Sequence, residues 1–154
     1  SLNSAELTNF LDHEDYDFAI QGGVGILKPF IIKRFKLGII NFHPGDLPQF
    51  RGCSAPEWQL HFGKKITSTA HLLDKGIDSG KIIKKKVLNV NLNSYYTFRA
   101  SIYPETALFV REIVTIIKSN PKIIDLAEEQ NHKEAVYRKY IGDEKIRELK
   151  HKLR

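Results

Sequence analysis

The sequence contains no methionine, a single cysteine and no long apolar run. Because Cys53 is alone, an intrachain disulfide and a zinc site built from several cysteines are excluded, and a reducing, cytoplasmic location is expected. No stretch reaches the roughly 18 apolar residues of a membrane span. The polar, acidic amino end shows no signal peptide, so we expect no membrane partner. The missing methionine indicates that Ser1 is a processed, tagged or truncated start.

Acidic residues are outnumbered by basic ones, since 24 Lys and Arg stand against 18 Asp and Glu and give a net charge of +6. This excess is compatible with anionic, phosphate-bearing small molecules and does not require nucleic acid. A chain of 154 residues with 42% hydrophobic residues is long enough for about one domain with its own core. We expect residues 1–127 to form that domain and residues 128–154 to form a charged extension with a helix.

A polar pair stands at the end of an apolar segment in the first third of the chain. Asn41 and His43 are two residues apart, so on a strand their side chains point to the same face, and Pro44 then ends the strand. Open α/β sheets bind ligands at the carboxyl ends of their strands. Asp78 lies in a loop after the next predicted strand, residues 66–73. Together these side chains offer an oxyanion donor, a proton carrier and a group that orients it.

A glycine-rich turn, residues 22–25, follows a short predicted strand and precedes a predicted helix. Such a turn raises the possibility of a dinucleotide site. Its glycine spacing is not Gly-x-Gly-x-x-Gly, and residues 39–41 lack the acidic residue that dinucleotide-binding folds carry about 20 positions later. A nucleotide-binding Rossmann module is therefore disfavoured, and a plain tight turn is the alternative to a ligand-binding one.

The remaining chain predicts both helices and strands. Polar and apolar residues alternate along residues 66–73, which favours a structural role for His71 on the face of a strand. Three lysines in the strand predicted over residues 81–90 indicate a protected sheet edge. Ser94 begins a long helix that contains Pro104, which is expected to kink it. A final short strand is predicted at residues 123–126.

The motifs between residues 39 and 80 resemble those of the formyltransferases that use 10-formyltetrahydrofolate. In chain order they are Asn41-x-His43-Pro44, Leu47-Pro48, Arg51-Gly52 and the loop Asp74-x-Gly76-x-Asp78-x-Gly80. Order and spacing match, and the resemblance covers roughly residues 2–117. It implies a Rossmann-like α/β catalytic domain with a mostly parallel sheet and helices on both faces.

The resemblance also implies roles for individual residues. Asn41 would donate to the developing oxyanion, His43 would carry a proton from the attacking amine, and Asp78 would set the charge state of His43. The formyl donor, 10-formyltetrahydrofolate, would bind between two glycine-bearing loops. The residues implied for its binding are Gly25, Ile26, Leu27, Asp74, Gly76 and Ile77. No metal is expected.

The resemblance implies a primary amine as the acceptor. A nucleotide-linked amino sugar is the preferred candidate, because residues 51–58 look more like the sugar-amine enzymes than the purine-pathway enzyme. Glycinamide ribonucleotide or methionyl-tRNA formyltransferase, formyltetrahydrofolate hydrolase, and a folate-binding fragment without turnover are the alternatives. No β-barrel follows the catalytic unit, which counts against tRNA and other nucleic acids.

In the resembling family, three strands that carry much of the acceptor site precede the strand at Phe18, and this chain lacks them. We therefore expect little transfer by the chain alone, and self-association through the unpaired strand.

Overall fold

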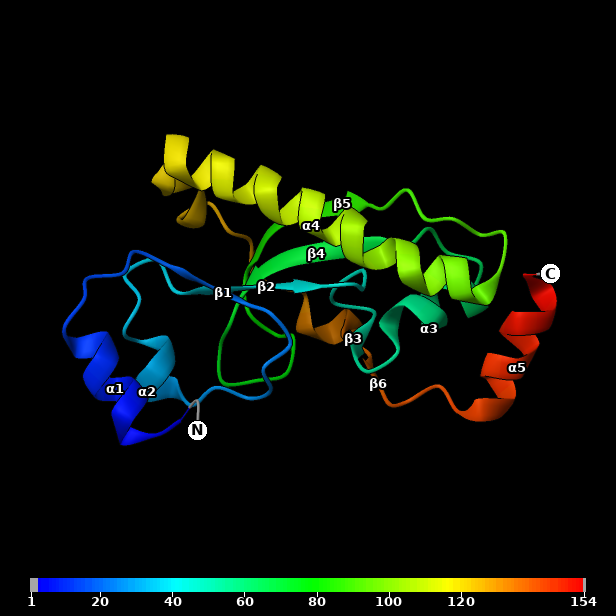
Figure 1. Cartoon of the computed structure of the whole chain (residues 1–154), viewed down its shortest axis with the longest axis horizontal. Coiled ribbons are helices and arrows are strands. Elements are labelled where there is room, and N and C mark those ends of the chain that lie inside the picture. The colour runs from blue at the N-terminus through cyan, green and yellow to red at the C-terminus, as the bar shows by residue number, and fades with distance from the viewer. Residues whose placement is uncertain (1–2, 154) are drawn as a thin grey trace.

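A computed structural model of the chain describes residues 3–153 and has a mixed α/β architecture, as predicted (Figure 1). The helices are α1 (Ala5–Asp12), α2 (Pro29–Ile32), α3 (Ala55–His61), α4 (Tyr95–Ser119) and α5 (Asp143–Lys152), with 3-10 helices η1 (Pro121–Ile124) and η2 (His132–Glu134). The strands are β1 (Ala19–Gln21), β2 (Ile39–His43), β3 (Arg51–Gly52), β4 (Thr67–Leu72), β5 (Ile82–Val87) and β6 (Tyr137–Arg138).

The main sheet has the strand order β1-β2-β4-β5. Within it, β1 and β2 are parallel, whereas the β2–β4 and β4–β5 pairs are antiparallel. The described sheet is therefore mixed rather than mostly parallel. The connection after β2 explains this. The chain leaves the sheet at the end of β2, passes through a loop and α3, and returns at the same end, where His43 pairs with Thr69. Strand β4 therefore runs antiparallel to β2.

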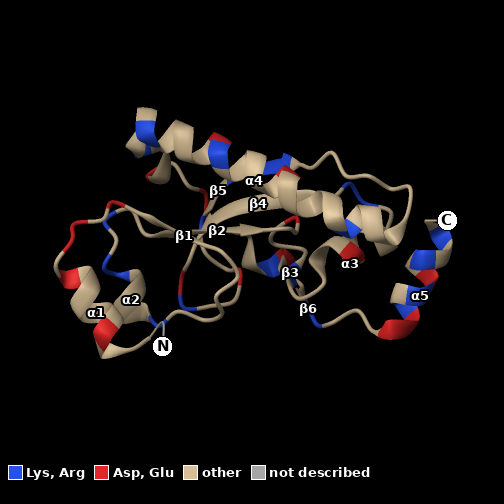
Figure 2. Ribbon diagram, in the orientation of Figure 1, with Lys and Arg blue, Asp and Glu red and all other residues tan. Residues whose placement is uncertain are grey.

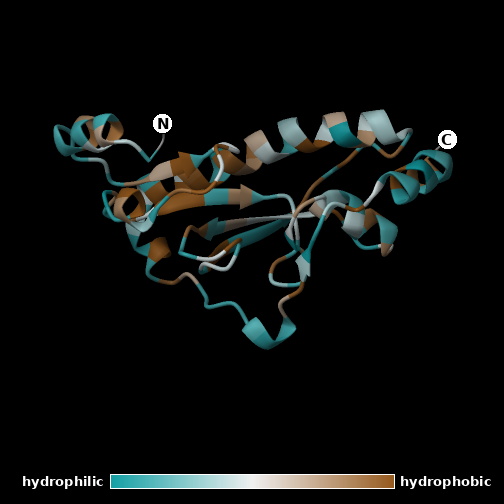
Figure 3. Ribbon diagram, turned by 90° about the horizontal axis from the view of Figure 1, so that it is seen from below, coloured by the Kyte–Doolittle hydropathy of each residue, from teal (hydrophilic) through white to brown (hydrophobic). Residues whose placement is uncertain are grey.

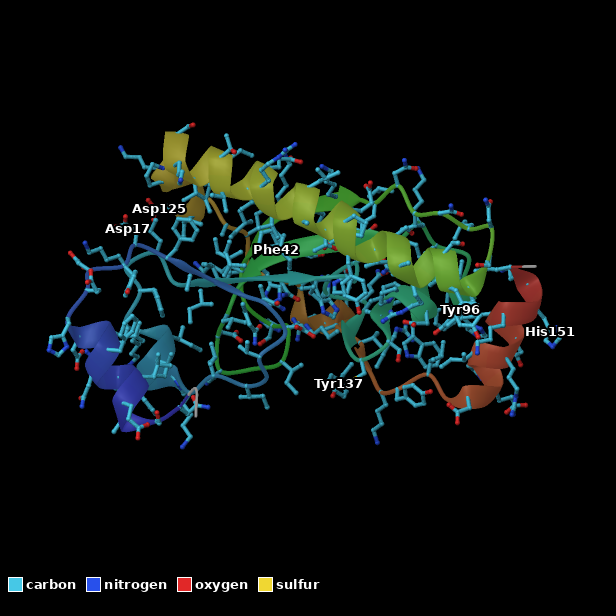
Figure 4. The ribbon with its side chains drawn as sticks, in the orientation of Figure 1. Asp17, Phe42, Tyr96, Asp125, Tyr137 and His151 are labelled. Carbon is cyan, nitrogen blue, oxygen red and sulfur yellow. The ribbon has the colours of Figure 1, made fainter. Side chains whose placement is uncertain are left out.

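One face of β2 and β4 is apolar and is covered by α4 (Figures 1 and 3). Phe42 lies beneath this helix (Figure 4), with its ring edge-on to that of Phe109 at a centroid distance of 5.5 Å. The other buried members of this cluster are Ile40, Ala70, Ile113, Ile117 and Ile124. Burial of apolar surface here fixes the helix against the sheet.

Helix α4 begins where the sequence predicts. The Ser94 side chain accepts a hydrogen bond from the Thr97 amide at 3.1 Å, and the Thr97 hydroxyl accepts one from the Ser94 amide at 2.9 Å. This reciprocal cap satisfies two amides that the helix cannot pair. The helix is continuous through Pro104.

The strand predicted at residues 123–126 is wrong, because η1 occupies the start of that range. Pro121 cannot donate to a sheet ladder and its fixed φ suits a tight helical turn. That turn buries Ile124 in the cluster beneath α4, which a strand leaving the helix would not do. Burial against α4 therefore overrides the β-branched character of this segment.

The charged carboxyl-terminal segment packs onto the rest of the chain. Its strand β6 pairs in parallel with β3, and its predicted helix is confirmed as α5. Leu149 of α5 is buried in a second cluster with Leu60 of α3 and Phe98 of α4. Charged residues recur along α5 and α4 (Figure 2), and the sides of these helices that face the protein supply the apolar contacts.

The lysines of β5 are paired with acids from two other segments. Lys84 and Lys86 lie 2.7 and 2.6 Å from the Glu112 carboxylate of α4, and Lys85 lies 2.6 Å from Asp46. The predicted edge position of this strand is confirmed. These pairs are partly exposed, so each adds little to stability.

Within residues 3–153, no helix is long and apolar enough to cross a membrane. In the same part of the chain, no group of three or more histidine, cysteine, aspartate and glutamate side chains is arranged to hold a metal ion.

The contact between α4 and the sheet predicts a large effect of one substitution. Phe109 is fully buried, so Phe109→Ala should lower the free energy of unfolding by about 3–5 kcal/mol, measured by urea denaturation. Leu108→Ala is the matched control, because Leu108 is 46% exposed and adjacent on the same helix. Equal losses from both variants would contradict the packing described.

Candidate active site

The second face of β2 and β4 is polar, and it brings together side chains from both strands. Asn41 pairs across the strands with His71. The Asn41 Nδ2 lies 3.2 Å from His71 Nε2, and His71 Nδ1 lies 2.9 Å from the Leu72 carbonyl oxygen. A carbonyl only accepts, so Nδ1 carries the His71 proton and Nε2 accepts from Asn41. One N–H of the Asn41 side chain therefore donates to His71, and its second N–H can donate to another group.

His43 is buried at the carboxyl end of β2. Its Nε2 lies 2.6 Å from the carbonyl oxygen of Phe50, so this nitrogen carries the proton in the neutral ring. Its Nδ1 lies 3.5 Å from the Asp78 Oδ2 and has a free lone pair. Nδ1 is therefore the atom at which His43 can accept a proton, directly beside a carboxylate that stabilises the resulting cation.

Asp78 occupies the junction between the two histidines. Its Oδ2 accepts a hydrogen bond from the Gly52 amide at 2.8 Å, and its Oδ1 lies 3.7 Å from His71 Nε2, beyond hydrogen-bonding distance. Asp78 has a φ of 50°, in the left-handed region that side chains rarely adopt. Its side chain is only 13% exposed, so the surrounding contacts must hold both its charge and its strained backbone.

The pKa values of His43 and Asp78 are both lowered. Burial lowers the His43 pKa below its ordinary 6.5, and the charge of Asp78 opposes that shift. For Asp78, burial raises the pKa, but the nearby His71 and His43 and the Gly52 amide together lower it overall. At neutral pH the site thus holds an imidazole ready to accept a proton beside an ionised carboxylate.

The same shifts set the sign of the pH effect on stability. Below pH 6.5 the unfolded chain protonates this histidine before the folded protein does, and in more acidic solution it likewise protonates Asp78 first. Both groups therefore contribute stability that is present at neutral pH. This contribution decreases as pH falls, first for His43 and then for Asp78.

All six residues implied for folate binding line one cavity of about 130 Å³ next to Asp78: Gly25, Ile26, Leu27, Asp74, Gly76 and Ile77. The first loop is shaped by Gln21, whose Nε2 donates to the Gly25 carbonyl at 2.6 Å. The second is shaped by Asp74, whose Oδ1 accepts from the Gly76 amide at 2.8 Å. Two loops distant in sequence are thus placed on either side of one cavity.

Two residues of this site were missed by sequence reasoning. His71 was expected to be a structural strand-face histidine, but it is fully buried and fixes Asn41. The alternation of polar and apolar residues correctly predicts that His71 lies on a strand face. Its partner on the neighbouring strand depends on register, which the alternation does not give. Gln130 belongs to no local motif, and no signal in the sequence indicated it.

Gln130 links three parts of the site. Its Nε2 donates to the carbonyls of Asp78 and Gly80 at 2.9 and 2.7 Å, and its Oε1 accepts from Arg51 at 2.6 and 3.1 Å. The residue is 4% exposed. It therefore holds the strained Asp78 backbone against the loop that carries Arg51 and Gly52.

Comparison with known proteins agrees with these motifs. A family model described as formyl transferase matches residues 1–97. This chain belongs to the formyl transferase family. The methionyl-tRNA formyltransferase of Clostridium perfringens (strain 13 / Type A) is 32% identical over 146 residues, which cover 92% of this chain and 46% of that protein. That of Thermodesulfovibrio yellowstonii is 39% identical over 77 residues, covering 49% and 25%.

The chain spans less than half the length of these curated relatives. Among solved structures, the formyltransferase PseJ from Anoxybacillus kamchatkensis, in complex with tetrahydrofolate and a UDP-linked formamido sugar, has a TM-score of 0.60 at 24% identity, covering 88% of this chain and 67% of that chain. Phosphoribosylglycinamide formyltransferase from Streptococcus pneumoniae has a TM-score of 0.59 at 26% identity, covering 73% and 65%. The predicted Rossmann-like formyltransferase fold is thereby confirmed.

The electrostatics of the site predict how His43 titrates. Its pKa should lie below 6.5, and Asp78→Asn should lower it further, because the carboxylate that favours the imidazolium is removed. The measurement is an NMR titration of the imidazole resonances. Asp46→Asn, which removes a partly exposed carboxylate paired with Lys85, should leave the His43 pKa unchanged. A higher pKa in Asp78→Asn would contradict this geometry.

A second expectation follows from the contacts of Gln130. Gln130→Leu keeps most of the volume but leaves the Asp78 and Gly80 carbonyls without their donor, so the free energy of unfolding should fall by about 2–4 kcal/mol. Hydrogen exchange of the amides in residues 78–80 should accelerate. The exposed Gln49 offers the control Gln49→Leu, which should change neither quantity. Unchanged exchange in Gln130→Leu would show that other contacts hold the loop.

Proposed function

We propose that the protein to which this chain belongs transfers a formyl group from 10-formyltetrahydrofolate to a primary amine. The observation that carries the proposal is the convergence of Asn41, His43 and Asp78 beside a cavity lined by every residue implied for folate binding. Membership of the formyl transferase family supports it. The chain covers only part of its relatives, so the proposal concerns the whole gene product.

The residues around the cavity suit a flat heteroaromatic ring. Ile26 is 79% exposed and Ile77 is 50% exposed, one on each loop that borders the cavity. Exposed apolar side chains flanking polar backbone groups are typical of ligand sites. A Cβ atom at Gly25 would meet nothing within 4 Å, so the space beside this glycine is open to a ligand. When bound, the folate supplies the formyl group and the departing nitrogen.

The roles of the three polar side chains follow from their geometry. The free N–H of Asn41 donates to the oxygen on which negative charge develops as the amine attacks. The Nδ1 of His43 accepts the proton that the amine loses. Asp78 stabilises the imidazolium at 3.5 Å, and the proton is then available for the leaving nitrogen. His71 keeps the Asn41 amide oriented throughout.

For the acceptor, we propose a nucleotide-linked amino sugar. The likeness of residues 51–58 to sugar-amine enzymes and the net charge of +6 support an anionic acceptor of this kind. Methionyl-tRNA is the second candidate, because the curated relatives that cover most of this chain are methionyl-tRNA formyltransferases. This chain spans less than half of those relatives, so the lack of a β-barrel after residues 1–127 does not count against methionyl-tRNA.

The test measures formyl transfer by the full-length protein to three acceptors: a UDP-linked amino sugar, glycinamide ribonucleotide and methionyl-tRNA. Asn41→Ala should lower kcat by about 100-fold or more, because an oxyanion donor is lost. Its affinity for 5-formyltetrahydrofolate, measured by calorimetry, should stay near that of the wild type. Release of formate without transfer to any amine would indicate a hydrolase, and no binding of the folate analogue would remove the folate assignment.

A further inference from the structure

A polar cavity of about 400 Å³ is lined in part by His43 and shares no lining residue with the cavity between the two glycine-bearing loops. It is bounded by the first turns of α3 and α4 and by the carboxyl-terminal segment, which supply Glu57, Tyr95, Arg99 and Tyr140. The volume is within the range of small-molecule sites. His43 and Gly52 also line this cavity, so it adjoins the proposed reaction centre.

Glu57 is the unusual residue of this cavity. It is 5% exposed, and its Oε1 accepts a hydrogen bond from the Tyr95 hydroxyl at 3.1 Å and lies 3.0 Å from Arg99 Nη1. Its Oε2 is buried and has no hydrogen-bond partner among the described residues. A buried carboxylate oxygen left unpaired is costly, so a native structure that keeps one needs a reason.

The contact between α3 and α4 does not require Glu57 Oε2, because Tyr95 and Arg99 of α4 both contact Oε1. Burial and the charge of Glu57 raise the pKa of Tyr95 to about 12, so its hydroxyl stays a donor at neutral pH. Oε2 is thus a carboxylate acceptor without a partner among the described residues, on a residue that lines the cavity.

The charges around Glu57 select the kind of group that fits. Arg99 already compensates the carboxylate, so a second cation at Oε2 would face a like charge, whereas a neutral hydroxyl would not. The Arg99 side chain is 37% exposed and retains donors for an anion. Lys150 of α5 adds positive charge 5.6 Å from the Tyr95 ring and 5.2 Å from that of Tyr96, which Figure 4 shows between α4 and α5.

We propose that Glu57 and Arg99 form an acceptor subsite, in which Glu57 Oε2 accepts a hydrogen bond from the ring hydroxyl next to the reacting amine and Arg99 contacts the phosphate of the same molecule. The subsite rests on the proposed formyl transfer and assigns two residues that would bind its amino-sugar acceptor. Because His43 lines the cavity, a sugar held there would have its amine near this histidine.

The test uses the full-length protein, 10-formyltetrahydrofolate, a UDP-linked amino sugar and its analogue without the ring hydroxyl next to the amine. For the wild type, KM of the analogue should be about tenfold higher, since a hydrogen bond to a charged group is lost. In Glu57→Gln, KM of the complete sugar should rise by a similar factor and the difference between the two sugars should shrink. Values of kcat should change by less than about threefold, because the bond is made equally in the ground and transition states.

Glu112→Gln is the matched control: this glutamate also joins α4 to another element through cations, Lys84 and Lys86, but it does not line the cavity. It should leave both KM values unchanged. Calorimetry with 5-formyltetrahydrofolate should give wild-type affinity for Glu57→Gln, whereas a general loss of structure would weaken it.

Equal KM values for the two sugars with the wild type would overturn the subsite even if Glu57→Gln failed to fold, and would leave formyl transfer standing. Transfer to methionyl-tRNA but not to the sugar would overturn the subsite and the amino-sugar acceptor, and would leave formyl transfer to a primary amine standing. No transfer to any amine would overturn the proposed function itself.

Discussion

The placement of the Asp78 carboxylate between two histidines is the constraint on which the rest of the site depends. A carboxylate that is only 13% exposed loses most of its hydration, and here the hydrogen bond from the Gly52 amide replaces part of it. The residue that carries this carboxylate adopts a left-handed φ of 50°. Gln130, from a segment beyond the family-model match, holds that conformation through two carbonyls.

The two-faced sheet explains how such a polar cluster is compatible with a stable core. On β2 and β4, Ile40, Phe42 and Ala70 pack in the cluster beneath α4, while the alternate residues include Asn41, His43 and His71. The hydrophobic burial on one face stabilises the strands that hold polar groups on the other. A shift of one residue in register would exchange the faces and destroy core and site together.

The carboxyl-terminal segment contributes to the candidate site as well as to packing. Through Gln130 it braces the Asp78 loop, and through β6 it pairs with the strand that carries Gly52. A Cβ atom at Gly52 would lie 2.4 Å from the Arg138 carbonyl oxygen, so only glycine permits this close approach. With α5 it also forms a wall of the cavity that contains Glu57. The site is thus assembled from segments more than 80 positions apart.

The sequence by itself determined the α/β class, the helix that begins after Ser94, the strand-end pair Asn41 and His43, and the two glycine-bearing loops. Each of these depends on local patterns: a capping box, alternation along a strand, and glycines at fixed spacing. The direction of β4, the partner of His71, the brace formed by Gln130 and the unpaired oxygen of Glu57 were decided only by tertiary structure. The physical reason is that strand register and long-range hydrogen bonds depend on how distant segments pack, and no local pattern encodes which segment supplies a buried partner.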